Sequence, residues 1–420
     1  MATDAGTVIQ ALRHTHQTDA GVPDALLTSP RRWYYRLTAG LVTFGLVALL
    51  LVWRDCPTPF VLGFLAAAGG AVATALFLSH ARLQNIAVTF ASSFLTLALI
   101  EGGIYVTTSS DIRAEMESKV PYYIADPDLG YGPQPGVKVE VRKYHREHLL
   151  YDTIYTIGHD GLRQIPESLQ GEACNVVFFG DSLMFGEGVG DDETLPASVL
   201  KGSGGRYRGY NFGFHGYGPH QMLRTVELGR LDKIVEGQPH VSIYLGIEAH
   251  VARAAGKVNW DLYGPRYQLS GKRGVEFIGP FHGAAYKTIH DSFKRSFLFR
   301  FLEDTFIMSG IMSGHFDPAD IPLYLAILER TREELASRYQ ARFVVLFWDD
   351  REGDTLTDQI LQGLREKHFE VIALSQIVPD IESDKRSYIF SEFDLHLNAR
   401  AYELIGTSLA HQLSQQSCRM

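Results

Sequence analysis

The chain has 420 residues and a formal net charge of −9 at pH 7, with 39 basic and 48 acidic residues. This length leaves room for more than one structural unit. The acidic balance provides no basic field that would hold a polyanion, so a nucleic-acid partner is excluded. The cysteines Cys56, Cys174 and Cys418 have neither metal-ligand nor redox spacing. We therefore expect no metal, no cofactor and no disulfide framework, and we interpret Cys174 as a small buried hydrophobe.

Residues 1–36 are a polar tail, and residues 37–107 are predicted to be a membrane anchor of three transmembrane helices. The apolar runs are Leu37 to Trp53, Phe60 to Ser79 and Ile86 to Thr107. Each is close to the ~20 residues that cross a hydrocarbon core. Buried helices of a soluble domain are the alternative, although three such runs with short polar joints are more typical of a membrane protein. The long polar lead disfavours a cleaved signal peptide.

Basic residues give the expected orientation of these spans. Arg31, Arg32 and Arg36 precede the first run, whereas Arg54 is the only basic residue in the loop that follows it. The positive-inside rule then places the N-terminus in the cytoplasm. We expect a multi-pass protein of the cell inner (cytoplasmic) membrane, with residues 108–420 on the extracytoplasmic, periplasmic side. Glu101, near the outer end of the third run, is either a functional intramembrane carboxylate or one that reaches interfacial water.

From Tyr122 onward, apolar strands alternate with amphipathic helices, which predicts an α/β fold with a doubly wound, flavodoxin-like parallel sheet. The expected strands are Val176 to Phe179, Tyr210 to Phe214, Val241 to Leu245, Phe343 to Phe347 and Val371 to Leu374. The expected helices are Thr194 to Leu200, Pro219 to Val235, Asp320 to Tyr339, Asp354 to Lys367 and Asn398 to Gln415. In such sheets the reactive groups collect outside the carboxyl ends of the strands.

Three segments flank or interrupt this pattern. Residues 126–136 form a loop rich in proline and glycine, followed by a strand at 151–157 that we expect to pack at the sheet edge without a chemical role. The aromatic insertion 257–285 is either a lid or substrate wall, or a hairpin with its own small core. Residues 286–312 suggest an amphipathic helix that either covers the domain or touches anionic headgroups.

The run Asn175-Val-Val-Phe-Phe-Gly-Asp-Ser182 brings a hydroxyl to the rim of the sheet, because a buried strand ends there at a glycine. Gly-Asp-Ser alone is weak evidence, since a serine after a strand is usually a turn or cap residue. Near the other end of the chain, Asp394 and His396 precede a predicted helix. A serine nucleophile needs a base, and the base needs an acid to orient it, so the three residue types together predict a catalytic triad.

The order of four blocks resembles the SGNH hydrolase superfamily, the GDSL esterases and lipases, of the membrane-anchored bacterial type. The blocks are Gly180-Asp-Ser182, Asn211-Phe-Gly213-Phe-His-Gly216, Leu245-Gly-Ile-Glu248 and Asp394-Leu-His396. The resemblance implies a serine nucleophile at Ser182, a general base at His396 and its acid at Asp394. It also implies that the backbone amides of Ser182 and Gly216 donate to the oxyanion, with Gly213 as the fallback.

The chain departs from the family pattern in two places. Where the family supplies an asparagine as a third oxyanion donor, this chain has Glu248, whose carboxylate would repel the developing charge. Glu248 then points away, is protonated, or is replaced in that role by His250 or Arg253. The family also usually has two residues between the acid and the histidine, and here only Leu395 intervenes, so Glu392 is an alternative acid.

These observations predict a membrane-tethered serine esterase or O-acyltransferase that acts through an acyl-enzyme on Ser182. By resemblance, its substrate is an acylated glycan, with O-acetyl groups on envelope or secreted polysaccharide. A lipid esterase, or a scaffold of glycan assembly that keeps the SGNH fold without catalysis, are the alternatives. The predicted partners are the membrane and the acylated glycan or lipid substrate, and the sequence identifies no protein partner.

Overall fold

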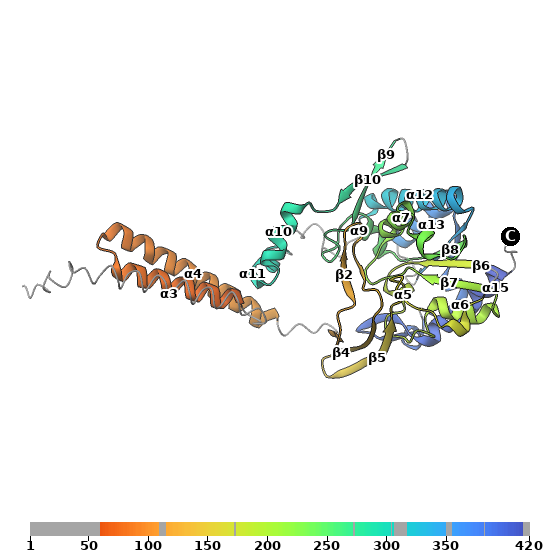
Figure 1. Cartoon of the computed structure of the whole chain (residues 1–420), viewed down its shortest axis with the longest axis horizontal. Coiled ribbons are helices and arrows are strands. Elements are labelled where there is room, and N and C mark those ends of the chain that lie inside the picture. Colours follow the sequence, from red (N-terminus) through yellow and green to blue (C-terminus); the bar gives the residue numbers. More distant parts are fainter. Residues whose placement is uncertain are drawn as a thin grey trace, which may run out of the picture. The chain divides into compact units, whose positions relative to one another are not determined.

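The computed structural model describes residues 59–108, 115–171, 174–271, 274–303, 305, 317–349, 355–381 and 383–414. They belong to two compact units. One is a helical unit within the first 109 residues, together with Lys294–Arg300. The other contains the remaining described residues and forms an α/β body with a central sheet (Figure 1).

The helical unit contains α3 (Pro59–Phe77) and α4 (Ala81–Thr108), both long and apolar enough to cross a membrane. They correspond to the second and third predicted spans, although α4 begins five residues before Ile86. Large apolar side chains on both helices are exposed, including Leu76 at 77% and Leu99 at 69%. That pattern differs from the buried helix of a soluble core. The first predicted span, Leu37 to Trp53, and the polar tail before it lie outside the described residues.

The Glu101 side chain of α4 is fully buried and caps the start of a helix in the segment 294–300 of this unit. Its carboxylate accepts hydrogen bonds from Ser296 Oγ at 2.8 Å and from the amides of Phe297 at 2.6 Å and Leu298 at 2.8 Å. These amides begin α11 (Phe297–Leu302). A carboxylate at this position satisfies the amides that a helix start leaves without partners.

The helix predicted over 286–312 is therefore not continuous. The structure has α10 (Ala284–Phe293) and a separate α11, because Ser296 Oγ accepts from the Phe299 amide and starts a new helix. Residues 294–300 belong to the helical unit, and 306–316 lie outside the described residues.

The central sheet of the α/β body has five parallel strands in the order β12-β11-β8-β6-β7. Their bounds are β6 Cys174–Phe179, β7 Tyr207–Asn211, β8 Pro239–Gly246, β11 Arg342–Phe347 and β12 Glu370–Ala373. Numbered along the chain, this is the order 2-1-3-4-5 of flavodoxin-like sheets, so the predicted fold class is confirmed. The order reverses between β6 and β8, and ligands of such sheets bind at that point.

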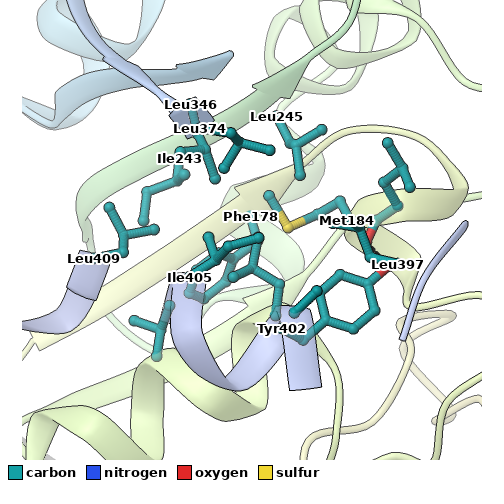
Figure 2. Close-up of a cluster of buried hydrophobic side chains, with 14 of the residues drawn as sticks. Phe178, Met184, Ile243, Leu245, Leu346, Leu374, Leu397, Tyr402, Ile405 and Leu409 are labelled. Atoms are coloured by element: carbon teal, nitrogen blue, oxygen red, sulfur yellow. Dashed lines mark hydrogen bonds between the residues drawn. The ribbon is translucent and has the colours of Figure 1, made fainter. Parts of the chain in front are cut away.

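Helices cover both faces of the sheet. Because side chains alternate along a strand, Val176 and Phe178 of β6 enter one core, and Val177 and Phe179 enter the other. The first core is closed by α6 (Leu195–Ser203), α14 (Leu374–Ile377) and α15 (Ala399–Ser414). Figure 2 shows Tyr402, Ile405 and Leu409 of α15 packed on Phe178 and Ile243 in this core. The second core is closed by α7 (Pro219–Glu227), α12 (Ile321–Tyr339) and α13 (Thr355–Glu366).

Among the predicted elements of the body, one strand is displaced and one helix is divided in the structure. β7 runs from Tyr207 to Asn211 rather than from Tyr210 to Phe214, so the glycines after it form a loop. The helix predicted from Pro219 to Val235 is split into α7 and α8 (Arg230–Ile234). The break lies at Gly229, which has a φ of +64°, a conformation that ends a helix and favours glycine.

A second sheet of three antiparallel strands precedes β6 and packs beside its carboxyl end. Its order is β1 (Glu115–Ser118), β4 (Lys138–His145) and β5 (His148–Thr156), and a hairpin of β2 (Tyr123–Asp126) and β3 (Gly130–Pro133) lies between β1 and β4 in the chain. Val141 and Tyr155 of this sheet share a core with Phe185 and Phe214. Phe185 ends α5 (Ser182–Phe185), the short helix after β6, and Phe214 lies in the loop after β7, so the second sheet supports the rim where Ser182 lies.

The insertion forms a hairpin of β9 (Pro265–Ser270) and β10 (Gly274–Pro280). Tyr267 and Val275 are buried in the second core, so the hairpin packs on the body through its aromatic face.

The short elements α5 (Ser182–Phe185), α9 (Ala249–Ala254), β13 (Ile389–Ser391) and β14 (Asp394–Leu397) carry the site. Within the described residues, short 3₁₀ turns lie at Glu167–Leu169, Pro318–Asp320 and Lys385–Ser387.

Cys174, at the start of β6, is buried as expected but is disulfide-bonded. The expectation of no disulfide is therefore wrong for this residue. Pairing joins residues that folding brings together, so cysteine spacing along the chain does not reveal it. Cys56 and Cys418 lie outside the described residues.

Candidate active site

Ser182 is held at the carboxyl end of β6 by the turn that starts α5. Gly180 allows this sharp turn because it has a φ of +157°, and a Cβ there would lie 2.8 Å from the Cβ of Met184. Asp181 caps α5 by accepting from the Leu183 amide at 3.0 Å. From α15, the Tyr402 hydroxyl donates to the Leu183 carbonyl at 2.8 Å. Contacts from both β6 and α15 therefore fix the position of the Ser182 hydroxyl.

Ser182, His396 and Asp394 form a continuous hydrogen-bonded relay. Ser182 Oγ lies 2.8 Å from His396 Nε2, and His396 Nδ1 lies 2.5 Å from Asp394 Oδ1. The His396 amide also donates to Asp394 Oδ1 at 3.1 Å, which fixes the turn between the two residues. For Nε2 to accept the serine proton, Nδ1 must carry the hydrogen and donate it to the carboxylate. The relay thus has the geometry of a nucleophile, a base and an orienting acid.

The electrostatics of the relay favour a charged imidazole. Burial opposes the charged form of His396, but the carboxylates of Glu187 and Asp394 outweigh burial and raise its pKa above the usual value. Burial also opposes the charged form of Asp394, yet His396 and Lys143 lower the pKa of its carboxyl below the usual value. Asp394 is therefore ionised at neutral pH and stabilises the imidazolium.

The single-residue spacing between acid and base does not prevent the relay, because β14 carries both residues. Glu392, the alternative acid, lies outside the relay and pairs with Arg386 at 3.2 Å on the surface.

Lys143, Glu187 and His215, which have no role predicted from the sequence, surround the relay. Lys143 Nζ lies 2.9 Å from Asp394 Oδ2 and 2.8 Å from Glu187 Oε1. Glu187 Oε2 in turn lies 2.7 Å from His215 Nδ1. Glu187 carried a usable signal, since it follows Ser182 by five residues between Gly186 and Gly188. No sequence feature indicated a role for Lys143, because only the fold brings β4 close to Asp394 and Glu187.

Glu187, Asp394 and His396 are the only three described residues of metal-ligand type whose ligand atoms lie within 4.8 Å of one another. The Lys143 ammonium already contacts both carboxylates of this group. An internal cation therefore offsets part of their charge, and we assign no metal to them.

Asp181 joins the nucleophile turn to α9. Its Oδ2 accepts from Arg253 Nη1 at 2.8 Å and lies 3.3 Å from His250 Nε2. Burial lowers the pKa of His250 to about 4, so this ring is neutral at pH 7. Burial opposes the charge of Asp181, but Arg253 and His250 lower the pKa of its carboxyl below the usual value. The paired Asp181 is therefore a structural anion behind Ser182.

The oxyanion donors expected from the sequence lie in different surroundings. As the first residue of α5, Ser182 has an amide without an intrahelical acceptor. The Gly213 amide donates to Asn211 Oδ1 at 3.0 Å, so it is not available to a substrate. Gly216 has a φ of +70°, and a Cβ there would meet Trp260 and Tyr131, so only glycine fits this loop. These contacts favour Gly216 over Gly213 as the second donor.

Ser182 opens into a cavity of about 380 Å³. Glu248 and Arg253 line it, whereas neither His250 nor the two loop glycines, Gly213 and Gly216, are among its lining residues. The rest of the wall is mostly apolar, with Leu183, Ile247, Trp348, Phe393 and Leu395. No described residue of the aromatic insertion lines the cavity, which favours the structural reading of that hairpin.

No protein-family model and no curated protein matches the chain. It is similar to solved structures that include a G-D-S-L family lipolytic protein from Desulfitobacterium hafniense DCB-2, with 11% identity, a TM-score of 0.35, and coverage of 56% of this chain and 98% of the other. A GDSL-like lipase from Parabacteroides merdae ATCC 43184 has 14% identity and a TM-score of 0.31, with coverage of 60% of this chain and 100% of the other. AlinE4, an SGNH-hydrolase family esterase, has 16% identity and a TM-score of 0.29, with coverage of 59% of this chain and 97% of the other. All three are GDSL or SGNH proteins. At these TM-scores the likeness assigns no function to this chain.

Proposed function

We propose that the chain is a membrane-anchored serine hydrolase of the SGNH type that acts on carboxylic esters. The observation that carries this proposal is the unbroken relay from Ser182 Oγ through His396 to Asp394, at 2.8 Å and 2.5 Å. If Ser182 only capped a turn, it would not require contact with an imidazole. If His396 only belonged to a solvated turn, it would not require a buried carboxylate beside it. The relay also disfavours the scaffold hypothesis, because a non-catalytic protein would not need this arrangement.

The reaction follows from these positions. Ser182 Oγ attacks the ester carbonyl carbon while its proton moves to His396 Nε2, and Asp394 stabilises the imidazolium. The amides of Ser182 and Gly216 are the proposed donors to the tetrahedral oxyanion. When the carbon–oxygen bond breaks, the proton passes from Nε2 to the leaving alcohol, and the acyl group remains on Ser182. Water or another hydroxyl then takes the acyl group by the reverse sequence, which gives hydrolysis or transfer.

The substrate class is an acylated glycan, with O-acetyl groups on envelope or secreted polysaccharide. The cavity of about 380 Å³ exceeds the needs of an acetyl group and has room for part of the alcohol that carries it. A lipid ester is the second candidate. It is favoured by Phe393 and Leu395, which are 53% and 51% exposed beside the cavity.

The proposed anchor consists of the predicted spans, with the N-terminus in the cytoplasm and the α/β body on the other side of the inner membrane. The two apolar helices α3 and α4 and the disulfide at Cys174 support this proposal, since disulfides persist mainly in oxidising compartments. Alkaline phosphatase fused after residue 109 should be active, whereas a fusion after residue 36 should be inactive. The reverse pattern would overturn the orientation.

Labelling of the full chain with a fluorophosphonate probe tests the nucleophile. The wild type should be labelled at Ser182 and should hydrolyse an aryl acetate, and Ser182→Ala should lose both. Ser203→Ala is a matched control on the same body, and it should retain both. A folded wild type that is not labelled would leave only the scaffold reading. Rates with acetyl, butyryl and octanoyl aryl esters then separate a glycan deacetylase, which prefers acetyl, from a lipid esterase.

A further inference from the structure

A second carboxylate lies beside the base of the relay. Glu187 Oε2 is 3.4 Å from His396 Nε2, the same nitrogen that contacts Ser182 Oγ. The side chain is only 7% exposed, so water screens its charge poorly. His396 therefore has Asp394 at one ring nitrogen and Glu187 near the other.

Three other parts of the body hold Glu187 in this position. The Tyr151 hydroxyl of β5 donates to its Oε1 at 3.0 Å, and Lys143 of β4 contacts the same oxygen. His215, from the loop after β7, contacts Oε2. A Cβ at the neighbouring Gly188 would lie 2.3 Å from the Phe390 ring, so the backbone runs close to β13 there. The carboxylate is therefore built into the site and cannot turn to solvent without breaking several contacts.

The charges of this cluster do not balance in the resting state. Glu187 and Asp394 are two anions, and Lys143 is the one cation that contacts both. Burial opposes the charge of Glu187, but His396, His215 and Lys143 lower the pKa of its carboxyl well below the usual value. The cluster becomes neutral when His396 accepts a proton.

The other titratable groups that face the cluster do not change this balance. Burial lowers the pKa of His215, and burial raises the pKa values of Tyr122, Tyr151 and Tyr155, so all four are neutral at pH 7. Arg163 is paired with Asp191 at 3.0 Å. Proton transfer from Ser182 to His396 therefore supplies the charge that the cluster lacks.

We propose that Glu187 is a positioning residue that acts as a second carboxylate for His396 and stabilises the imidazolium formed during acyl transfer. This inference rests on the proposed nucleophile at Ser182. As the serine proton reaches Nε2, Glu187 Oε2 faces the same nitrogen and lowers the energy of the developing positive charge. Lys143 opposes this effect, because its ammonium offsets part of the charge of the two carboxylates and lowers the pKa of His396.

Substitutions of Glu187 and Lys143 should shift the acid limb of the pH–rate profile of Ser182 acylation in opposite directions. The limb reports protonation of His396, since only the neutral imidazole can accept the serine proton. Glu187→Gln removes a nearby anion and should move the limb to lower pH by about 1 to 3 units, with a plateau rate about 10-fold lower. Lys143→Met removes a nearby cation and should move the limb to higher pH. Glu187→Asp retains the charge and should stay near the wild type.

The measurement is the second-order rate constant for fluorophosphonate labelling of Ser182 in the full chain between pH 5 and 9. Asp192→Asn is the control, because it removes an exposed carboxylate, 65% exposed, from the same loop. Thermal unfolding of each variant identifies loss of structure, and a fold defect cannot produce opposite shifts of the limb. If Glu187→Gln leaves the limb in place while the wild type is labelled, the inference is wrong and the nucleophile stands. If the wild type is not labelled at any pH, both fail.

Discussion

Lys143 Nζ lies 2.9 Å from Asp394 Oδ2, so a strand of the small antiparallel sheet reaches the acid of the relay. Both side chains are shielded, at 13% and 1% exposure. Burial opposes the charge of Lys143, but Glu187 and Asp394 raise the pKa of its ammonium above the usual value. The lysine therefore stays charged throughout the neutral range. The antiparallel sheet is thus part of the proposed site, and it also packs against the body.

Asp394→Asn should lower kcat for an aryl ester by about 10³ to 10⁴ while the protein stays folded. The amide cannot stabilise the imidazolium, and it can hold the wrong tautomer of His396. Glu392→Gln is the matched control, because Glu392 is two residues away and pairs with Arg386 on the surface. It should keep the wild-type rate. A large loss in the Glu392 variant together with an active Asp394 variant would mean that the acid has been misassigned.

The sequence was sufficient to predict the parallel sheet and the relay, because both depend on local patterns. A fully apolar strand such as Val176 to Phe179, buried on both faces, is typical of a parallel sheet with helices on both sides. Ser182 follows a predicted strand and His396 precedes a predicted helix. The order of strands and helices therefore predicts that both lie at the rim of the sheet.

Lys143 could not be placed in this way, since no local pattern links it to Glu187 and Asp394, which it contacts across the chain. Lys143 stands on an antiparallel strand whose alternation shows only which face is buried. Likewise, Glu101 looked like an isolated charge in an apolar run, and its acceptor role depends on a helix start almost two hundred residues later. Such contacts between residues distant in the sequence can be recognised only once the fold is known.

Glu248→Gln should raise kcat/KM for an aryl acetate about 10-fold. Glu248 lines the same cavity as Ser182, and an ionised carboxylate there opposes the developing oxyanion. Glutamine keeps the shape and removes the charge. Glu236→Gln is the control, because the Glu236 side chain is 77% exposed and contacts Arg208. An unchanged rate in the Glu248 variant would place its carboxylate away from the oxyanion, and a lower rate would indicate a contact with the substrate.

Arg163→Met should lower the free energy of unfolding of the α/β body by about 3 to 5 kcal/mol. The Arg163 guanidinium is fully buried and donates to the carbonyls of Gly186 at 3.0 Å and Val189 at 2.8 Å, as well as to Asp191. Methionine would remove all three hydrogen bonds, although the Thr156 amide would still donate to Asp191 and the Val189 amide to Gly186. The same loop carries Glu187, so the variant should also loosen the site.

Denaturant unfolding, followed by fluorescence from the body, measures this effect. Arg208→Met is the control, since Arg208 pairs with an exposed carboxylate and its loss should cost less than about 1 kcal/mol. Equal unfolding midpoints for the two variants would contradict the role given to Arg163.

Glu101→Ala should release the segment 294–300 from the helical unit. The carboxylate is the acceptor for Ser296 Oγ and for two amides of α11, and hydrogen bonds to a charged group contribute about 1.5 to 3 kcal/mol. Trypsin should then cut at Lys294, Arg295 or Arg300 about 10-fold faster in the detergent-solubilised full chain, because cleavage follows the population of the open form. Glu101→Gln retains one acceptor oxygen and should be intermediate. Ser93→Ala on the exposed side of α4 should match the wild type, and equal cleavage of all four proteins would show that Glu101 does not hold this segment.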